Sequence, residues 1–271
     1  MHDISIYCDA GERAGLGHVT RMGHLEQALR DRGAYTELDV GSESDDFKKW
    51  RPKYPVVLID VPNNNDGWLH LLKHLRPSIK LIVFVGVGQS ITLRTLWLAD
   101  LIVYQVVRGA GVLQQWPKEF WPKLMTNQEA IMLDPRIRRG EPKSGAAVYF
   151  GAGYSRAYAE AIGAAIGRSP TMRADAIVTN WPRLLAHAEE YVGTMGMAAY
   201  DAAAAGCKIT VICRTEEHLA DAKAAGFSIA GLGEPSIKQI QKARRRAKTC
   251  DLIDSAGVYR VAERILELAK T

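Results

Sequence analysis

The stretch AGLGHVTRMGHLEQALRDRG, residues 14–33, combines a glycine-rich turn with the apolar periodicity of a helix. It follows the run Ile4–Ile6, which is typical of a buried strand. In an open α/β sheet the loop after the first strand lies at the carboxyl edge, where glycines let helix N–H groups approach a phosphate or a developing negative charge. We therefore expect a strand at residues 4–8, a helix from Val19 to Arg32, and a ligand site that contains His18.

Strand and helix patterns alternate along the whole chain and start again near residue 146. Further apolar strands are predicted in the first half at residues 35–40, 56–60, 81–87 and 99–105. A proline-rich crossing at residues 108–145 precedes a second series, which includes a predicted strand at 175–180 and a helix at 197–206. The order predicts an α/β protein of two Rossmann-like, doubly wound domains, residues 1–140 and 141–271, that face each other across a cleft.

Composition limits the class of protein. The chain has 271 residues, of which 47% are hydrophobic, as in globular domains that bury their own cores. It has no uncharged apolar run of about 18 residues and no secretory signal pattern, so we expect a cytoplasmic protein without a membrane span. The four cysteines form no C-x-x-C pair, which argues against disulfides and cysteine metal sites. The net charge of +5 favours anionic ligands.

His18 has two interpretations from local sequence alone. An imidazole beside a glycine turn can take a proton from a hydroxyl or water, or donate a hydrogen bond to a substrate oxygen. It can equally cap the helix without touching a ligand. A single G-x-G is a weak signal, so the rest of the chain has to decide between these interpretations.

Four stretches in order give the chain a family resemblance. Residues 14–33 resemble the G-x-G-H-x-x-R opening of the nucleotide-sugar hydrolases of pseudaminic acid synthesis and the related spore-coat polysaccharide proteins, which are small relatives of the GT-B glycosyltransferases. EAIMLDPRI (129–137), YVGTMGMAAYDAAAAGCKITVI (191–212) and LIDSAGVYRVAERILEL (252–268) are similar to later motifs of the same family. The resemblance covers most of the chain and implies a GT-B-like fold that acts on a nucleotide-sugar.

The resemblance also implies roles for particular residues. His18 of the first domain would be the catalytic base. Asp201 stands where the family has a glutamate that holds the ribose hydroxyls. The other positions implied to contact the nucleotide-sugar, largely through main-chain groups, are Gly15, Gly17, Arg21, Gly151, Gly153, Val178, Thr179, Thr194, Met195, Gly196 and Met197. For Arg21 the alternative is a side chain that covers the helix surface, and for Asp201 it is a solvated helix position.

Departures from the family pattern leave the sugar and acceptor open. The family's GGST motif is Met195–Ala198 here, so a hydroxyl donor near the phosphates is missing, although Thr194 can replace it. Thr215–His218 stand where the family has an aspartate-asparagine-glutamine group that contacts the sugar. Asp45 and Asp46 lie beside lysines in a helix-like run rather than at a strand end, and we expect chemistry that needs no metal.

The function hypotheses follow from these matches and departures. The leading one is a glycosyltransferase that moves a sugar from a UDP-like donor to an acceptor hydroxyl. A nucleotide-sugar hydrolase, in which water replaces the acceptor, is the alternative. A third hypothesis, from a different class, is a polyanion or nucleic-acid binder, because KQIQKARRRAK (238–248) is rich in lysine and arginine. The first and third hypotheses combine if the acceptor is modified DNA.

Overall fold

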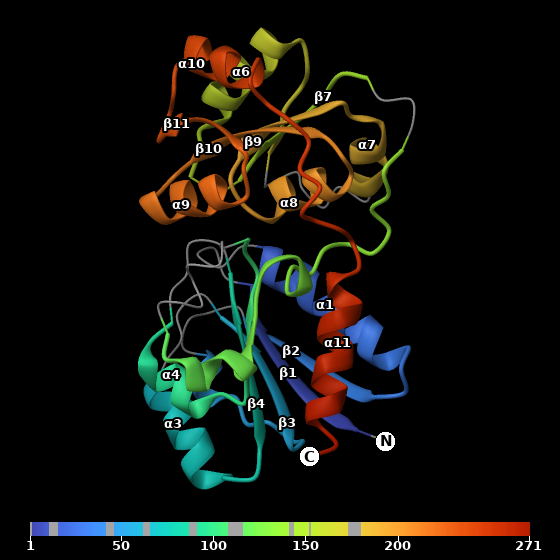
Figure 1. The fold of residues 1–271 in the computed structure, drawn as a ribbon, viewed down its shortest axis with the longest axis vertical. Coiled ribbons are helices and arrows are strands. Elements are labelled where there is room, and N and C mark those ends of the chain that lie inside the picture. Colours follow the sequence, from blue (N-terminus) through green and yellow to red (C-terminus); the bar gives the residue numbers. More distant parts are fainter. Residues whose placement is uncertain are drawn as a thin grey trace. The chain divides into compact units, whose positions relative to one another are not determined.

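A computed structural model of the chain describes residues 2–10, 16–41, 46–61, 66–86, 91–107, 116–140, 144–151, 153–172 and 180–271 (Figure 1). The chain divides into two compact units. Residues 1–132 and 256–271 form the first unit, and residues 133–255 form the second. The predicted division at residue 140 is therefore corrected in two places. The chain leaves the first unit earlier, and its last helix returns to that unit.

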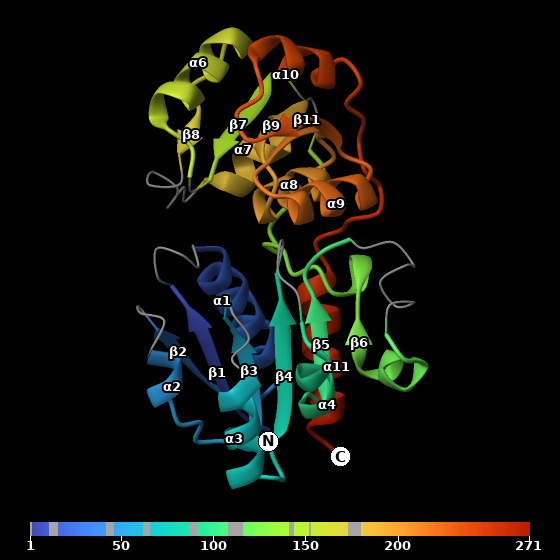
Figure 2. The ribbon, with the colours of Figure 1, turned by 90° about the vertical axis from the view of Figure 1, so that its left-hand side faces the viewer.

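The first unit is built on a parallel sheet with helices on both faces. Its strands are β1 (Asp3–Asp9), β2 (Tyr35–Gly41), β3 (Val56–Asp60), β4 (Lys80–Val85), β5 (Leu101–Tyr104) and β6 (Leu124–Met125). Its helices are α1 (Leu16–Arg30), α2 (Asp46–Lys49), α3 (Asp66–Leu75), α4 (Leu93–Leu98), α11 (Gly257–Leu268) and the 3₁₀ turns η1 (Lys118–Lys123) and η2 (Asn127–Glu129). Figure 2 shows the strands side by side in the order β2-β1-β3-β4-β5-β6.

The strands of this sheet alternate their side chains between two hydrophobic cores. On one face Ile4, Ile6 and Leu58 pack against α1 and α11, and on the other Val57 and Ile59 pack against α3 and α4. Alternation follows from the two-residue period of a strand, and both faces are apolar because helices cover both (Figure 1). The apolar face of α11 completes the first of these cores, which explains why the last helix belongs to this unit.

The second unit has the same construction. Its strands are β7 (Ala146–Phe150), β8 (Thr171–Met172), β9 (Glu190–Thr194), β10 (Lys208–Cys213) and β11 (Ser228–Leu232). Its helices are α6 (Arg156–Ile166), α7 (Trp181–His187), α8 (Met197–Ala204), α9 (Glu216–Ala224) and α10 (Ile237–Arg244). In Figure 1, α6 and α10 cover one face of the sheet, and α8 and α9 cover the other.

Both sheets share one strand order, and this order locates the expected ligand sites. The second sheet runs β11-β10-β9-β7-β8, so in each unit the first strand lies between the second and the third. The first strand of each sheet pairs in parallel with both of these neighbours. The chain passes from the first strand to the second on one side, and then crosses back to the third strand on the other side. This reversal makes the gap between the first and third strands a topological switch point. Ligands of open α/β sheets bind there, at the carboxyl ends of the strands.

Most predicted elements lie within a few residues of the observed ones. The strand at 56–60 is confirmed at the same bounds, and the first helix begins at Leu16 rather than Val19. The supposed interdomain crossing instead contains η1, β6 and η2, which belong to the first unit because β6 pairs with β5. The strand predicted at 175–180 lies almost entirely outside the described residues.

Candidate active site

A buried ionic cluster occupies the switch point of the first unit. His18 and Arg21 lie one turn apart on α1, which follows β1, and Asp60 is the last residue of β3. The His18 Nδ1 lies 2.7 Å from Asp60 Oδ1, and Arg21 Nε donates to Asp60 Oδ2 at 2.5 Å. A second donor of Arg21, Nη2, also contacts Asp60 Oδ1. All three side chains are at least nine-tenths buried.

Charge decides where the proton of the imidazole lies. Burial raises the pKa of Asp60, but the neighbouring Arg21 and His18 outweigh it and hold the pKa at about 2. An ionised carboxylate accepts hydrogen bonds and cannot donate one, so we assign the His18 Nδ1 as the protonated nitrogen that donates to Asp60. Arg21 Nη2, 2.9 Å from the same nitrogen, is then a close neighbour and not a donor to it. The other ring nitrogen, Nε2, keeps its lone pair and can accept a proton.

The cluster refines what the sequence indicated for α1. His18 lies at the predicted edge of the sheet, and its Asp60 contact gives it more than a capping role. The interpretation that Arg21 covers the helix surface is wrong, because its side chain is 5% exposed and engaged by Asp60. Its predicted diphosphate contact stays a prediction. Gly17 lies within α1, and a Cβ at this position would meet nothing within 4 Å.

Asp60 is the residue that sequence reasoning missed. Its signal was present: it is a carboxylate directly at the end of the wholly buried strand VVLID, on the strand that neighbours β1. A carboxylate there costs free energy unless it is paired. The pairing partners are 39 and 42 residues away in the sequence, so only the strand order reveals them.

The switch point of the second unit brings together the residues after β7 and β9. The main-chain N–H of Gly151 donates to the Thr194 hydroxyl oxygen at 3.1 Å, and the Tyr191 hydroxyl donates to the Thr194 carbonyl at 2.9 Å. The N–H of Met195 donates to the Ile212 carbonyl at 2.9 Å, which engages this amide within the sheet edge. Of the predicted main-chain donors at this strand end, those of Gly196 and Met197 come next, at the beginning of α8.

Two glycines shape the main chain beside this edge. Gly153 has a φ of +88°, a left-handed conformation that other residues rarely adopt. Gly196 precedes the first residue of α8, and a Cβ there would meet nothing within 4 Å. The first turn of a helix has N–H groups without intrahelical partners, and these attract anions. The arrangement suits an approach of phosphate oxygens to Gly196 and Met197.

Asp201 lies one turn into α8 and is half-buried. The Trp181 indole N–H donates to its Oδ2 at 3.1 Å. Burial raises the pKa of Asp201 to about 7, and the carboxylate of Asp134 acts in the same direction, against hydrogen bonds from Trp181 and the Asp134 main chain. The alternative of a fully solvated position is therefore wrong. A carboxyl has about four acceptor sites, so Asp201 can accept from Trp181 and the Asp134 main chain and still accept hydrogen bonds from a diol.

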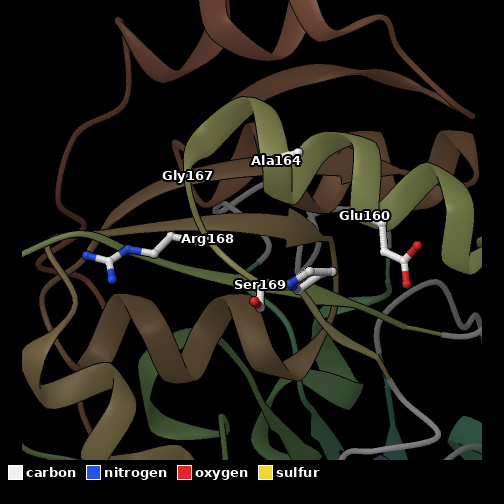
Figure 3. Close-up of a pocket in the computed structure, with 6 residues that line it drawn as sticks. Glu160, Ala164, Gly167, Arg168 and Ser169 are labelled. Atoms are coloured by element: carbon white, nitrogen blue, oxygen red, sulfur yellow. The ribbon is translucent and has the colours of Figure 1, made fainter.

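Gly15, Val178 and Thr179 lie outside the described residues. Figure 3 shows a surface hollow at the end of α6, lined by Glu160, Ala164, Gly167, Arg168, Ser169 and Pro170. No predicted site residue lines this hollow. Among the described residues, no group of three or more His, Cys, Asp or Glu side chains comes together in a way that could hold a metal ion. Within the same residues, no helix has the length and apolar character to cross a membrane.

Other motifs from the sequence have structural roles. Phe120 is buried in the core of the first unit, and Trp121 donates to the Trp116 carbonyl at 3.1 Å, so this aromatic segment is anchored to the core. His70 and His74 are exposed on α3 with parallel rings 6.3 Å apart. All four cysteines are buried and remain thiols, without disulfide bonds.

Comparisons with known proteins first define a class of fold. No protein-family model and no curated protein matches the sequence. Solved structures do match: the fold is that of α/β proteins with two Rossmann-like domains, and the predicted GT-B-like fold class is confirmed. Since the identities are low, this likeness concerns the fold, and one fold can serve several functions.

The particular matches are enzymes described with nucleotides or nucleotide-sugars. The structure of MnaA from S. aureus with UDP aligns with a TM-score of 0.60 at 12% identity, covering 100% of this chain and 97% of that one. UDP-GlcNAc 2-epimerase from Neisseria meningitidis, bound to UDP-GlcNAc, gives 0.55 at 9% identity, with 98% and 100% covered. The spinosyn rhamnosyltransferase SpnG, complexed with thymidine diphosphate, gives 0.51 at 11% identity, with 100% and 96% covered.

Proposed function

We propose that the protein is a nucleotide-sugar-dependent enzyme, and specifically a glycosyltransferase that uses a UDP-like donor. The observation that carries this proposal is the His18–Asp60 contact at the switch point of a sheet, in a fold shared with enzymes solved with UDP, UDP-GlcNAc and thymidine diphosphate. A buried carboxylate that fixes the tautomer of an imidazole is a common way to prepare a general base.

In the proposed reaction His18 Nε2 removes the proton of the acceptor hydroxyl. The freed electron pair forms a bond to the anomeric carbon of the sugar, and the bond from this carbon to the diphosphate oxygen breaks. The diphosphate leaves with that bond's electron pair. Asp60 stabilises the imidazolium that forms, as its ionised state at neutral pH allows.

The second unit would bind the donor. Main-chain N–H groups at the start of α8 would stabilise the negative charge that grows on the leaving diphosphate, and Asp201 would accept hydrogen bonds from the ribose hydroxyls. We propose that this charge is met by protein groups without a resident metal. Trp181 supports the ribose role of Asp201, because its indole N–H holds the carboxyl in place one turn into α8.

Two other reactions use the same donor. A hydrolase would place water where the acceptor hydroxyl lies. An epimerase would change the sugar while it stays attached to UDP, and the fold likeness to UDP-GlcNAc 2-epimerases makes this the third candidate. Incubation with UDP-GlcNAc and related UDP-sugars, followed by NMR of the sugar, separates the three. A transferase leaves the donor unchanged until an acceptor is added. Rapid release of free sugar and UDP would replace the transferase proposal with hydrolysis, and a changed sugar on intact UDP would replace it with epimerisation.

For the acceptor we propose a polyanion, with modified nucleic acid as the candidate. Arg244 is paired with Glu190, but five cations of the run 238–248 are exposed and form no ion pair among the described residues: Lys238, Lys242, Arg245, Arg246 and Lys248. Phosphate binding by such groups weakens steeply with salt. Binding of duplex DNA that does not respond to salt would remove this acceptor. Binding of DNA without turnover of any UDP-sugar would favour the non-catalytic binder.

A further inference from the structure

Arg214 occupies a place at the carboxyl edge of the second sheet that the sequence motifs did not assign. It directly follows β10, and its main-chain N–H donates to His218 Nδ1 at 3.4 Å. Its guanidinium lies against Gly153: a Cβ built on Gly153 would be 2.9 Å from the Arg214 Cζ. In the sheet order β9 separates β10 from β7. The Arg214 side chain therefore reaches past the end of β9, where α8 begins, to the loop after β7.

The residue next to Gly153 carries an unsatisfied group. The hydroxyl oxygen of Tyr154 is buried and has no hydrogen-bond partner among the described residues. Burial raises the pKa of Tyr154 to about 12, while the nearby Arg214 guanidinium lowers it, which places the two groups within electrostatic range. A buried hydroxyl without a partner is unfavourable, and its usual explanation is a ligand, ion or water that satisfies it.

The second unit needs such groups, because other candidate donors at this edge are engaged. The Met195 N–H is bonded to the Ile212 carbonyl, and the Gly151 N–H is bonded to the Thr194 hydroxyl oxygen. Residues 195–198 contain no side-chain hydroxyl. A diphosphate carries a high negative charge, and a guanidinium offers it paired donors in a planar geometry.

We propose that Arg214 and Tyr154, beside the main chain of Gly153, form a subsite for the diphosphate of the donor. The identity of the ligand rests on the proposed function. Residues 195–198 lack the hydroxyl that the related motif supplies near the phosphates, and Arg214 supplies a cationic donor in its place. The Tyr154 hydroxyl donates to a phosphate oxygen. The subsite contacts the diphosphate and not the nucleoside.

The test compares ligands that differ only in the diphosphate. Binding of UDP, uridine and inorganic pyrophosphate is measured by isothermal titration calorimetry with the full chain and with Arg214→Ala, Arg214→Lys and Tyr154→Phe. Arg168→Ala is the matched control, because Arg168 is exposed at the end of α6 on the same unit and its loss changes the net charge equally. Circular dichroism checks that each variant is folded.

We expect Arg214→Ala to weaken UDP and pyrophosphate binding about tenfold, as for the loss of a charged hydrogen bond, and to leave uridine within about twofold. Arg214→Lys retains part of the affinity, and Tyr154→Phe weakens UDP about fivefold without lowering the melting temperature. Equal losses for UDP and uridine, or none, overturn the subsite while UDP binding itself still supports the proposed function. If the wild type binds pyrophosphate through Arg214 but no nucleotide, the proposed function falls and the anion subsite stands.

Discussion

Replacing Asp60 by asparagine tests the ionic cluster of the first unit. The substitution keeps the shape of the side chain but removes the charge that pairs with Arg21. The pKa of Asp60 is lowered from 3.8 to about 2, and this difference of about 1.8 units corresponds to about 2 kcal/mol. Leaving the Arg21 guanidinium buried without its partner adds to that cost, and breaking buried pairs typically destabilises by about 3–5 kcal/mol. We expect a loss in this range at pH 7.

The dependence of this loss on pH gives the prediction its direction. The folded pKa lies below the unfolded one, so the stabilisation is fully present above about pH 4 and is lost as the pH falls towards 2. The difference in unfolding free energy between wild type and Asp60→Asn is therefore expected to shrink by about 2 kcal/mol between pH 7 and pH 2.

Urea unfolding followed by circular dichroism measures this difference, and only the transition of the first unit is expected to move. Asp31→Asn is the control, because Asp31 is an exposed carboxylate on the same unit. A loss below about 1 kcal/mol at pH 7, or a loss that stays constant down to pH 2, would show that the cluster does not carry the charges assigned to it.

Three further predictions concern the proposed chemistry. His18→Ala is expected to lower kcat by about 10²–10⁴-fold while UDP affinity, measured by calorimetry, stays within a few fold; equal loss of both would give His18 a structural role instead. Asp201→Asn is expected to be more stable than wild type at pH 8, by about 2 kcal/mol after allowance for partial exposure, and not at pH 4. The raised pKa of Asp201 makes its stabilisation complete below about pH 4 and lost as the pH rises through 7, so melting temperatures that run parallel from pH 4 to 8 contradict it. Trp181→Phe removes a donor that lowers the pKa of Asp201, so UDP binding is expected to weaken at pH 7 and recover at pH 8.5; a loss independent of pH would point to ring contacts with the nucleotide.

Much of the fold was predictable because its signals are local. VVLID is a continuous apolar run and forms β3 at the expected bounds, and the periodic stretch that contains His18 forms a helix as expected, from Leu16 to Arg30. The domain boundary could not be predicted from local sequence signals. The apolar face of α11 fits any uncovered sheet, and its sequence does not say which one; the structure places Val258 and Val261 in the core of the first unit.

The sites divide in the same way. His18 was accessible to sequence reasoning because a histidine beside a glycine turn carries its own chemistry. Asp60, the partner of both His18 and Arg21, was not accessible in this way. Its contacts join residues about 40 positions apart, which only the strand order brings together. Arg214 was hidden for a similar reason, since its neighbour Gly153 lies two strands away in the sheet.

The return of α11 to the first unit has a consequence for synthesis on the ribosome. Residues 133–255 are continuous, so the second unit has its complete set of elements before residues 257–268 are translated. Until then Met22 and Leu29 lack the helix that covers them, and the hydrophobic core of the first unit is incomplete. The half that is made first is thus expected to mature last, and a chaperone that protects nascent apolar surface would hold it for most of translation.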